Sequence, residues 1–474
     1  MADALWTTQE LVAATGGTLI GQVHGPLNGV SIDSRAINSG DIFVAIKGDK
    51  MDGHDFVAGA LKAGAGIAVV SKVTDDMRAA GAVLQVAEDP LRGLENMGRA
   101  ARAWSKGQIV AVTGSVGKTS TKEMLRVALS ASGETHASAA SFNNHWGVPL
   151  TLARLSRKAA YGIFEVGMNH AGEITPLVKM VRPHVAIVTT IAASHLGHFD
   201  SLDAIAQAKS EIFSGVVADG AAVINQDSPY FDFLAGQAKA HGIQNIYGFG
   251  QHANAAVRLE QVALHASCCC VTADVMGERV SYKLGVPGAH MAMNSLAVLA
   301  AVKLMGADLA RATMALALAQ PAKGRGVQES LEIEGGEFLL IDESYNANPA
   351  SVAAALALLG NVRPRRNGRR VAVLGDMLEL GDFGPKLHAD IAKNLAEQGV
   401  DLLFAAGPLM QNLWAEMPEA KLGAYAATSN ELKDSLLGAL RADDVVMVKG
   451  SLGIRMGILV DTLREKFPAV KKEG

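Results

Sequence analysis

The sequence predicts an α/β protein built from three domains. Its 474 residues suffice for about three domains of ordinary size. Nearly continuous apolar runs alternate with helical patterns through the middle and the end of the chain, which is typical of parallel strands covered by helices. Hydrophobic residues make up 49% of the chain and charged residues 19%, so we expect a globular protein rather than a disordered one.

The first predicted domain covers residues 1–85. Short strand patterns at 30–32, 42–46 and 67–70 are separated by turns rich in glycine and aspartate. A helical segment over 90–106 then leads into the second block. The first block has no phosphate-binding loop of its own.

The second predicted domain covers residues 86–320 and alternates strands with helices. Strands at 162–166, 185–190 and 221–225 are almost continuously apolar, which favours a mainly parallel sheet buried on both faces. Residues 245–290 instead alternate apolar and polar positions, and they predict an antiparallel insert.

The third predicted domain covers residues 321–474. Strands are expected at 338–341, 370–374, 401–405 and 445–448, with helical segments between them. This pattern predicts a second doubly wound, Rossmann-like unit. Two such α/β domains in one chain are expected to close on a ligand held between them.

Charge and apolar patterning limit the classes of partner. A net charge of −4 gives no reason to expect nucleic acid. No apolar run is long enough to span a bilayer and the amino terminus lacks a signal-peptide pattern, so we expect a cytoplasmic protein without membrane insertion. The consecutive cysteines 268–270 cannot readily form a disulfide framework or a metal cage.

Residues 109–124 carry the most informative motif of the chain, in which an apolar strand is followed by TGSVGKTS and a helical pattern. In such an arrangement the loop N–H groups and the helix N-terminus hold phosphate. Lys118 would reach the terminal phosphates, and the Thr119 hydroxyl would bind Mg²⁺. Val112 replaces the first glycine of the full pattern. The motif predicts ATP binding by Thr113, Gly114, Ser115, Val116, Gly117, Lys118, Thr119 and Ser120.

Other chemically active side chains follow or adjoin predicted strands of the second block. Glu165 ends one strand, where a carboxylate can face the phosphate loop and ligate Mg²⁺. His195 comes just past the next strand, where it could join a second cation. Lys209 lies in a helical segment, and its spacing alone is that of an ordinary solvated lysine.

The third block adds a second group of candidates. Asp342 and Asn346 lie where a strand runs into a turn, a favourable place for ligand contacts, although such residues are also common in turns. Arg325 lies between the second and third blocks and could clamp a transferring phosphoryl group, the alternative being a solvated linker arginine. Lys449 ends another strand and could hold an anionic substrate.

With these residues in view, the chain resembles the Mur ligase family, whose members build peptidoglycan precursors. The likeness runs nearly end to end and rests on the segments TGSVGKTSTKEM, FNNHWGVPLTL, EVGMNHAGEI, AKSEIFSG, DESYNANP, LGDMLELG and VKGS. It is strongest to members that add a dipeptide. The resemblance implies an N-terminal UDP-binding module, a central P-loop ATPase and a C-terminal Rossmann-like domain, and it favours a monomer.

The resemblance also implies an ATP-dependent, ADP-forming amide ligation. The terminal carboxylate of a UDP-MurNAc-tripeptide would attack the γ-phosphate of ATP, and the amine of D-Ala-D-Ala would then displace phosphate. Phosphorylation is needed because a carboxylate is a poor electrophile at neutral pH. Lys118 and Mg²⁺ would offset the repulsion between the two anions that must meet.

The resemblance assigns roles residue by residue. Catalytic roles fall on Lys118, His195, Lys209 and Arg325. The family's metal sites match Thr119, Glu165, His195 and Lys209, the last at the place of a lysine that many members carry as a carbamate. Adenosine and phosphate contacts match Asn294, Arg325 and Asp342. The UDP substrate matches Ser34, Arg35, Lys47, Asp52, Gly53, His54, Asn143 and Asn144, and the dipeptide side matches Asn346, Lys449 and Ser451.

Two other functions stay open on the sequence alone. A ligase of the same superfamily with another substrate, such as a folylpolyglutamate synthase, would share the ATPase, but the segments SIDSR and DGHDF favour a UDP module. A P-loop binding or regulatory protein would not need Glu165, His195, Lys209 and Arg325 together.

Overall fold

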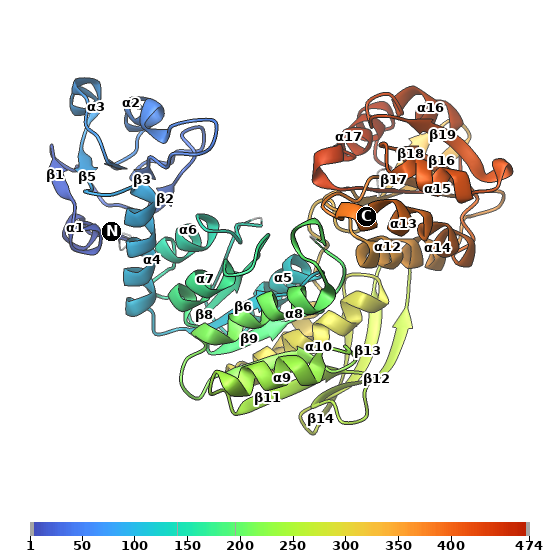
Figure 1. The fold of residues 1–474 in the computed structure, drawn as a ribbon, viewed down its shortest axis with the longest axis horizontal. Coiled ribbons are helices and arrows are strands. Elements are labelled where there is room, and N and C mark those ends of the chain that lie inside the picture. The colour runs from blue at the N-terminus through green and yellow to red at the C-terminus, as the bar shows by residue number, and fades with distance from the viewer. Residues whose placement is uncertain (1–3, 140, 195, 471–474) are drawn as a thin grey trace.

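The computed structural model describes residues 4–139, 141–194 and 196–470. They form three lobes that follow one another in chain order, each built on its own sheet (Figure 1). The sheets have five, nine and six strands and are mostly parallel. The predicted α/β class and three-domain organisation are therefore confirmed, whereas the limits at residues 85 and 320 stay a prediction.

The first sheet is parallel except at one edge, where β1 runs antiparallel to β5. Its strands follow the order β1-β5-β4-β3-β2. They are β1 (Thr18–Ile20), β2 (Gly29–Ser31), β3 (Asp41–Val44), β4 (Ile67–Val70) and β5 (Val83–Gln85). The surrounding helices are α1 (Thr8–Thr15), α2 (Val57–Lys62) and α3 (Asp75–Ala80).

The N-terminal domain is fastened to the central one by a shared apolar core. Two helices, α4 (Pro90–Trp104) and α6 (Gly147–Ala153), contribute side chains to the same cluster as β3, β4 and β5. The Trp6 indole donates a hydrogen bond to the Ala153 carbonyl at 2.9 Å, and Arg154 Nε donates to the Val30 carbonyl at 2.6 Å. The two domains therefore meet through buried contacts rather than through a loose linker.

The central sheet has the order β14-β13-β12-β11-β10-β9-β6-β8-β7. The first six strands of the chain order are β6 (Gln108–Thr113), β7 (Thr135–Ala137), β8 (Tyr161–Glu165), β9 (Val185–Val188), β10 (Ala221–Asn225) and β11 (Asn245–Gly250). The remaining three are β12 (Val257–Leu264), β13 (Cys269–Val275) and β14 (Glu278–Leu284).

The antiparallel insert predicted over 245–290 is partly wrong. β11 runs parallel to β10 and extends the parallel sheet, and only β12, β13 and β14 form antiparallel pairs. An alternating pattern reports which face of a strand is buried but not the direction of its neighbour, so the sequence could not separate β11 from the rest. The three cysteines are free thiols, as expected.

Helices cover both faces of the central sheet because alternate residues of its strands point to opposite sides. Val110 and Val112 of β6 face a core that contains α5, α10 and α11, whereas Ile109 and Ala111 face α6, α7, α8 and α9. Besides α6, these helices are α5 (Lys118–Ser130), α7 (Ile174–Val181), α8 (Leu202–Ser210), α9 (Phe231–Ala240), α10 (Ala289–Leu304) and α11 (Leu309–Leu316).

The C-terminal sheet has the order β15-β16-β20-β17-β18-β19, with one antiparallel hairpin, β15 and β16, at its edge. The strands are β15 (Val327–Ile333), β16 (Gly336–Glu343), β17 (Arg370–Gly375), β18 (Leu402–Ala406), β19 (Leu422–Ala426) and β20 (Val445–Lys449). One face packs against α12 (Pro349–Asn361), α14 (Ile391–Glu397) and α15 (Met410–Glu416). The other face packs against α16 (Lys433–Ala439) and α17 (Gly457–Lys466), while α13 (Gly384–Ala389) precedes α14. In the described part of the chain, no helix is both long and apolar enough to cross a membrane.

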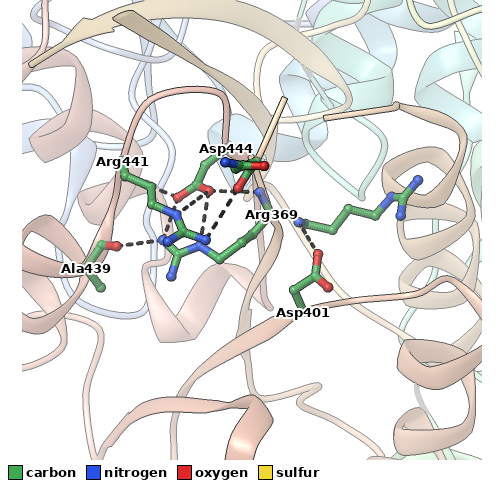
Figure 2. Close-up of polar contacts among 7 residues, drawn as sticks. Arg369, Asp401, Ala439, Arg441 and Asp444 are labelled. Atoms are coloured by element: carbon green, nitrogen blue, oxygen red, sulfur yellow. Dashed lines mark hydrogen bonds and ion pairs between the residues drawn. The ribbon is translucent and has the colours of Figure 1, made fainter. Parts of the chain in front are cut away.

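Asp444 ties the amino ends of the two middle strands of this sheet together (Figure 2). Its carboxylate, 0% exposed, accepts hydrogen bonds from Arg369 Nε at 3.1 Å and Arg369 Nη2 at 2.7 Å. Arg369 Nη2 also donates to the Ala439 carbonyl, and the Arg441 N–H donates to Asp444 Oδ2 at 3.1 Å. Since Arg369 precedes β17 and Asp444 precedes β20, this buried ion pair fixes the spacing of both strands.

Replacing Asp444 with alanine should destabilise the C-terminal domain by about 3 kcal/mol or more, because it leaves the buried face of Arg369 without its partner. Urea unfolding followed by circular dichroism measures the loss. Asp401 is a matched control, since it is exposed and accepts one backbone hydrogen bond from Arg370, at 2.8 Å. Asp401→Ala should cost about 1 kcal/mol. Equal losses in the two variants would contradict the role given to Asp444.

Candidate active site between the central and C-terminal domains

A cleft of about 380 Å³ lies between the central and C-terminal domains. Its walls come from the loops that follow β6, β8 and β9 on one side and β16, β17 and β20 on the other. Ligands of parallel α/β sheets bind beyond the carboxyl ends of the strands, so both domains present their binding edges to the same space. Near the cleft, the Gly197 N–H donates a hydrogen bond to the Glu379 carbonyl at 2.8 Å and joins the two domains directly.

The loop between β6 and α5 has the geometry of a phosphate cradle. Gly114 and Gly117 have φ angles of +145° and +88°, which side chains other than glycine rarely adopt. A Cβ atom on Gly114 would also collide with the Thr189 hydroxyl. Ser115 anchors the loop, because its N–H donates to the Thr190 carbonyl and its Oγ to the Ala192 carbonyl, each at 2.8 Å. No side chain caps α5, which leaves its first N–H groups for an anion.

Lys118 is folded back over this loop. Its Nζ donates a hydrogen bond to the Gly114 carbonyl at 2.6 Å. Burial lowers the pKa of Lys118 and Arg325 acts in the same direction, while Glu165 opposes both. An anion in the cradle would therefore stabilise the charged form of Lys118 and gain a strong hydrogen-bond donor.

The oxygen atoms beside the cradle suit a magnesium ion. Thr119 Oγ1 donates a hydrogen bond to Glu165 Oε2 at 3.0 Å, and Asn143 Nδ2 donates to Glu165 Oε1 at 2.8 Å. Glu165 is only 1% exposed, and it lines the cleft together with Thr119 and Asn143. Mg²⁺ usually takes one or two protein oxygens and completes its shell with phosphate and water. That preference agrees with the absence, among the described residues, of any cluster of three or more acidic, histidine or cysteine ligands.

Lys209 is not the solvated lysine that its spacing suggests. It is 1% exposed at the end of α8, and its side-chain amine makes no hydrogen bond or ion pair with another described residue. Burial holds the pKa of Lys209 well below its usual range, and the charge of Lys118 adds to that effect. The neutral form of its amine is therefore easier to reach than in a solvated lysine.

The C-terminal wall carries a buried ion pair. Lys449 Nζ lies 3.5 Å from Glu343 Oε2 and donates a hydrogen bond to the Asn346 carbonyl at 2.9 Å. Glu343 and Lys449 are register partners in the parallel pair β16 and β20. Ser451 Oγ accepts a hydrogen bond from the Leu378 N–H at 2.9 Å. Arg325 stacks its guanidinium on the Tyr345 ring at 4.2 Å.

Comparison with known proteins places this architecture in a family. Family models match residues 26–88 (Mur ligase family, catalytic domain), 112–302 (Mur ligase middle domain) and 330–452 (Mur ligase, glutamate ligase domain). A UDP-N-acetylmuramoyl-tripeptide–D-alanyl-D-alanine ligase of Escherichia coli is 33% identical over 443 residues, which cover 93% of this chain and 94% of that protein. The chain belongs to the Mur ligase family.

Solved structures agree with this assignment. The crystal structure of MurF from Acinetobacter baumannii is 33% identical to this Mur ligase, with a TM-score of 0.84 over 97% of this chain and 99% of that one. A MurF ligase from Thermotoga maritima, solved in complex with ADP, has a TM-score of 0.75 at 23% identity. The matched region covers 93% of this chain and 98% of the T. maritima chain. At this identity the likeness shows the fold alone.

Most of the predicted nucleotide and dipeptide residues lie together in this Mur ligase. The cleft is lined by residues from both domains, among them Ser115, Val116, Gly117, Lys118, Thr119, Ser120, Asn143, Glu165, Arg325, Asn346, Lys449 and Ser451. Asn294 lies behind the phosphate loop, where its Nδ2 would be 2.6 Å from a Cβ atom on Gly117. His195 lies outside the described residues, next to Ser194, which lines the cleft.

Two residues with predicted ligand contacts also make hydrogen bonds within the protein. Asp342 is 1% exposed and does not line the described part of the cleft; it accepts a hydrogen bond from Ser344 Oγ at 2.6 Å and pairs with Arg464 at 3.4 Å. Asn144 Oδ1 accepts a hydrogen bond from the Gly147 N–H at 2.9 Å and thereby holds the start of α6. In this structure both side chains support loops that carry other residues of the site.

The predicted UDP residues of the N-terminal domain lie at the carboxyl ends of its strands, in the lobe farthest from β15 to β20 in Figure 1. His54 Nδ1 lies 2.6 Å from Asp52 Oδ1, and its Nε2 accepts a hydrogen bond from the Ser71 N–H at 3.0 Å. Hydrogen bonds from His54 bring the pKa of Asp52 to about 2. Gly53 is packed so tightly that a Cβ atom there would lie 2.6 Å from the Ile46 carbonyl. Ser34 is half-buried, while Lys47 and Arg35 are exposed.

Sequence reasoning missed Glu343, Tyr345 and His290, all of which line the cleft. The first two belong to the segment DESYNANP, so the signal was present in the motif but was assigned only to Asp342 and Asn346. His290 lies in the first turn of α10, which begins at Ala289.

Replacing Gly114 with alanine should weaken ATP binding by roughly tenfold or more, because the loop must move to accommodate a φ and a contact that alanine does not tolerate. Calorimetric titration with ATP measures the effect. Gly236 is a matched control on α9, with no heavy atom within 4 Å of the position that its Cβ would take. Gly236→Ala should bind ATP normally and gain about 0.5 kcal/mol of stability. Normal ATP binding by Gly114→Ala would remove the cradle from nucleotide recognition.

Proposed function

We propose that this Mur ligase joins D-alanyl-D-alanine to UDP-MurNAc-tripeptide, with conversion of ATP to ADP and phosphate. The observation that carries the proposal is that a phosphate cradle and a buried lysine–glutamate pair face one cleft from two different domains. The E. coli relative and the A. baumannii structure support the choice of substrates, since each matches more than nine-tenths of the chain.

The first step activates the tripeptide carboxylate. The loop N–H groups and Lys118 hold the terminal phosphates of ATP, while the substrate carboxylate approaches the γ-phosphate from the C-terminal side. Arg325, stacked on Tyr345 in the opposite wall, holds negative charge on the transferring group. Thr119 and Glu165 would hold Mg²⁺, which when bound supplies the charge neutralisation that two converging anions require.

The second step forms the amide. The dipeptide amine attacks the carbonyl carbon of the acyl phosphate, the C–N bond forms, and the C–O bond to phosphate breaks. Asn346, Lys449 and Ser451 line the wall from which the dipeptide would approach, and the Lys449 ammonium can hold its carboxylate.

The remaining assignments complete the proposal. Ser34, Arg35, Lys47, Asp52, Gly53, His54, Asn143 and Asn144 hold the UDP-sugar end, and Asn294 and Asp342 serve the adenosine side. His195 and Lys209 complete a second cation site. The lowered pKa of Lys209 favours its carbamate, because CO₂ reacts with the uncharged amine and converts it into a carboxylate-like ligand. The protein acts as a cytoplasmic monomer of three domains, 1–85, 86–320 and 321–474.

The decisive assay measures phosphate release from ATP with UDP-MurNAc-tripeptide, with and without D-Ala-D-Ala. Turnover should require both substrates and yield the UDP-MurNAc-pentapeptide, identified by mass spectrometry. Lys118→Ala should release no phosphate above background. ATP consumption with a single amino acid in place of the dipeptide would instead identify a different ligase of the family, and nucleotide binding without turnover would identify a binding protein.

Lys209→Ala should lower the rate of ligation roughly 10²-fold or more, since it removes a ligand of the second cation, which would neutralise charge on the transferring phosphoryl group. Added formate or acetate should restore part of the activity by occupying the vacated space with a carboxylate. Lys179→Ala, on the exposed side of the neighbouring α7, is the control and should behave as the wild type. Full activity of Lys209→Ala would exclude this lysine from the mechanism.

A further inference from the structure

The cleft contains a carboxylate that the mechanism above leaves without a task. Glu343 ends β16, its side chain is 13% exposed, and it lines the cleft together with Arg325 and Lys449. A Cβ atom on Gly326 would lie 3.2 Å from Glu343 Oε1, so the backbone of the interdomain segment packs close beside this carboxylate. Burying a carboxylate is costly, and a single ion pair at 3.5 Å leaves it hydrogen-bonding capacity.

The second step needs a group of this kind. An α-amine has a pKa of about 8, so most of the dipeptide arrives as an ammonium ion without a lone pair for attack. One proton must leave the nitrogen before the C–N bond forms. A base that lines the cleft on the C-terminal side would receive that proton where the dipeptide enters.

Three other ionisable groups in the described wall, Glu165, His290 and Lys449, are less suited to this task. Both oxygens of Glu165 accept hydrogen bonds, from Thr119 and Asn143, beside the phosphate cradle. Burial brings the pKa of His290 to about 4, and nearby Lys449 adds to that effect, so its imidazole binds protons poorly. Lys449 itself donates to the Asn346 carbonyl and is the charge partner of Glu343.

We propose that Glu343 is the general base of the second step and takes the proton from the ammonium group of the incoming dipeptide. This role rests on the ligase function proposed above. One ammonium proton passes to a Glu343 oxygen, and the free lone pair forms the C–N bond. The C–O bond then breaks with its electron pair on phosphate, which takes up the second nitrogen proton as it leaves. The product amide retains the third.

The surroundings of Glu343 tune it for this exchange. Burial raises its pKa, while Lys449 and Arg325 oppose that rise and Asp342, on the same strand, adds to it. His290 is close enough to Lys449 to be affected by its charge, and its pKa of about 4 leaves it neutral. A carboxylate with a raised pKa is a stronger base than a solvated one, and the charges of Lys449 and Arg325 favour its ionised form.

Two nucleophiles distinguish a base from a merely structural residue. D-Ala-D-Ala arrives protonated, whereas hydroxylamine is uncharged at neutral pH and attacks an acyl phosphate without help from a base. Glu343→Gln keeps the size of the side chain and a carbonyl oxygen that can face Lys449. With this variant, pentapeptide formation should fall roughly 10²-fold, whereas hydroxamate formation from ATP, UDP-MurNAc-tripeptide and hydroxylamine should stay near the wild-type rate.

The pH profile gives a second readout. The deficit of Glu343→Gln with the dipeptide should shrink as the pH rises above the pKa of the dipeptide amine, because the nucleophile then arrives deprotonated. Glu332→Gln, on the neighbouring β15 and exposed, is the matched control and should equal the wild type throughout.

Each result has a defined meaning. An equal loss with both nucleophiles, or a deficit that does not change with pH, would overturn the role of Glu343 as a base. Unchanged pentapeptide formation by Glu343→Gln would overturn it as well. If the wild type forms the hydroxamate but no pentapeptide, the proposed dipeptide ligation fails first, and the role of Glu343 fails with it.

Discussion

Two parallel sheets direct their carboxyl ends at one cleft, and the chemistry of the protein depends on that single geometric constraint. A parallel sheet brings its strand-end loops to the same edge, so residues far apart in the chain meet without long excursions of the backbone. Here the loop after β6 supplies phosphate-binding N–H groups, while β16 and β20 supply a carboxylate and an ammonium. Neither sheet alone contains both a nucleotide cradle and a place for a second substrate.

The cleft brings three basic side chains, Lys118, Arg325 and Lys449, close to three carboxylates, Glu165, Glu343 and Glu379. Lys118 and Lys449 both have pKa values lowered by burial, and Arg325 adds to the effect on each. Such a collection of partly desolvated cations lowers the stability of the empty protein. Polyanionic substrates relieve that cost when they bind, so the same charges that strain the free protein favour closure around nucleotide and acyl phosphate.

The parts of the site that could be predicted from sequence are those encoded within a few neighbouring residues. Gly114, Gly117 and Lys118 fall in one short motif, and the strand before it and the helix after it both formed where expected. Pairings between distant strands were not accessible in this way. Glu343 meets Lys449 only because β16 lies beside β20, and Asp342 turns to Arg464 only because α17 packs on the same sheet.

The buried junction between the N-terminal and central domains has a consequence for substrate choice. Trp6, Arg154 and the core shared with α4 and α6 hold those two domains as one body. A substrate whose nucleotide end rests on the first domain and whose carboxylate must reach the phosphate cradle therefore spans a set distance. Under the proposed function this set distance selects substrates by length. A peptide stem that is too short does not bring its carboxylate to the γ-phosphate, whatever its side chains.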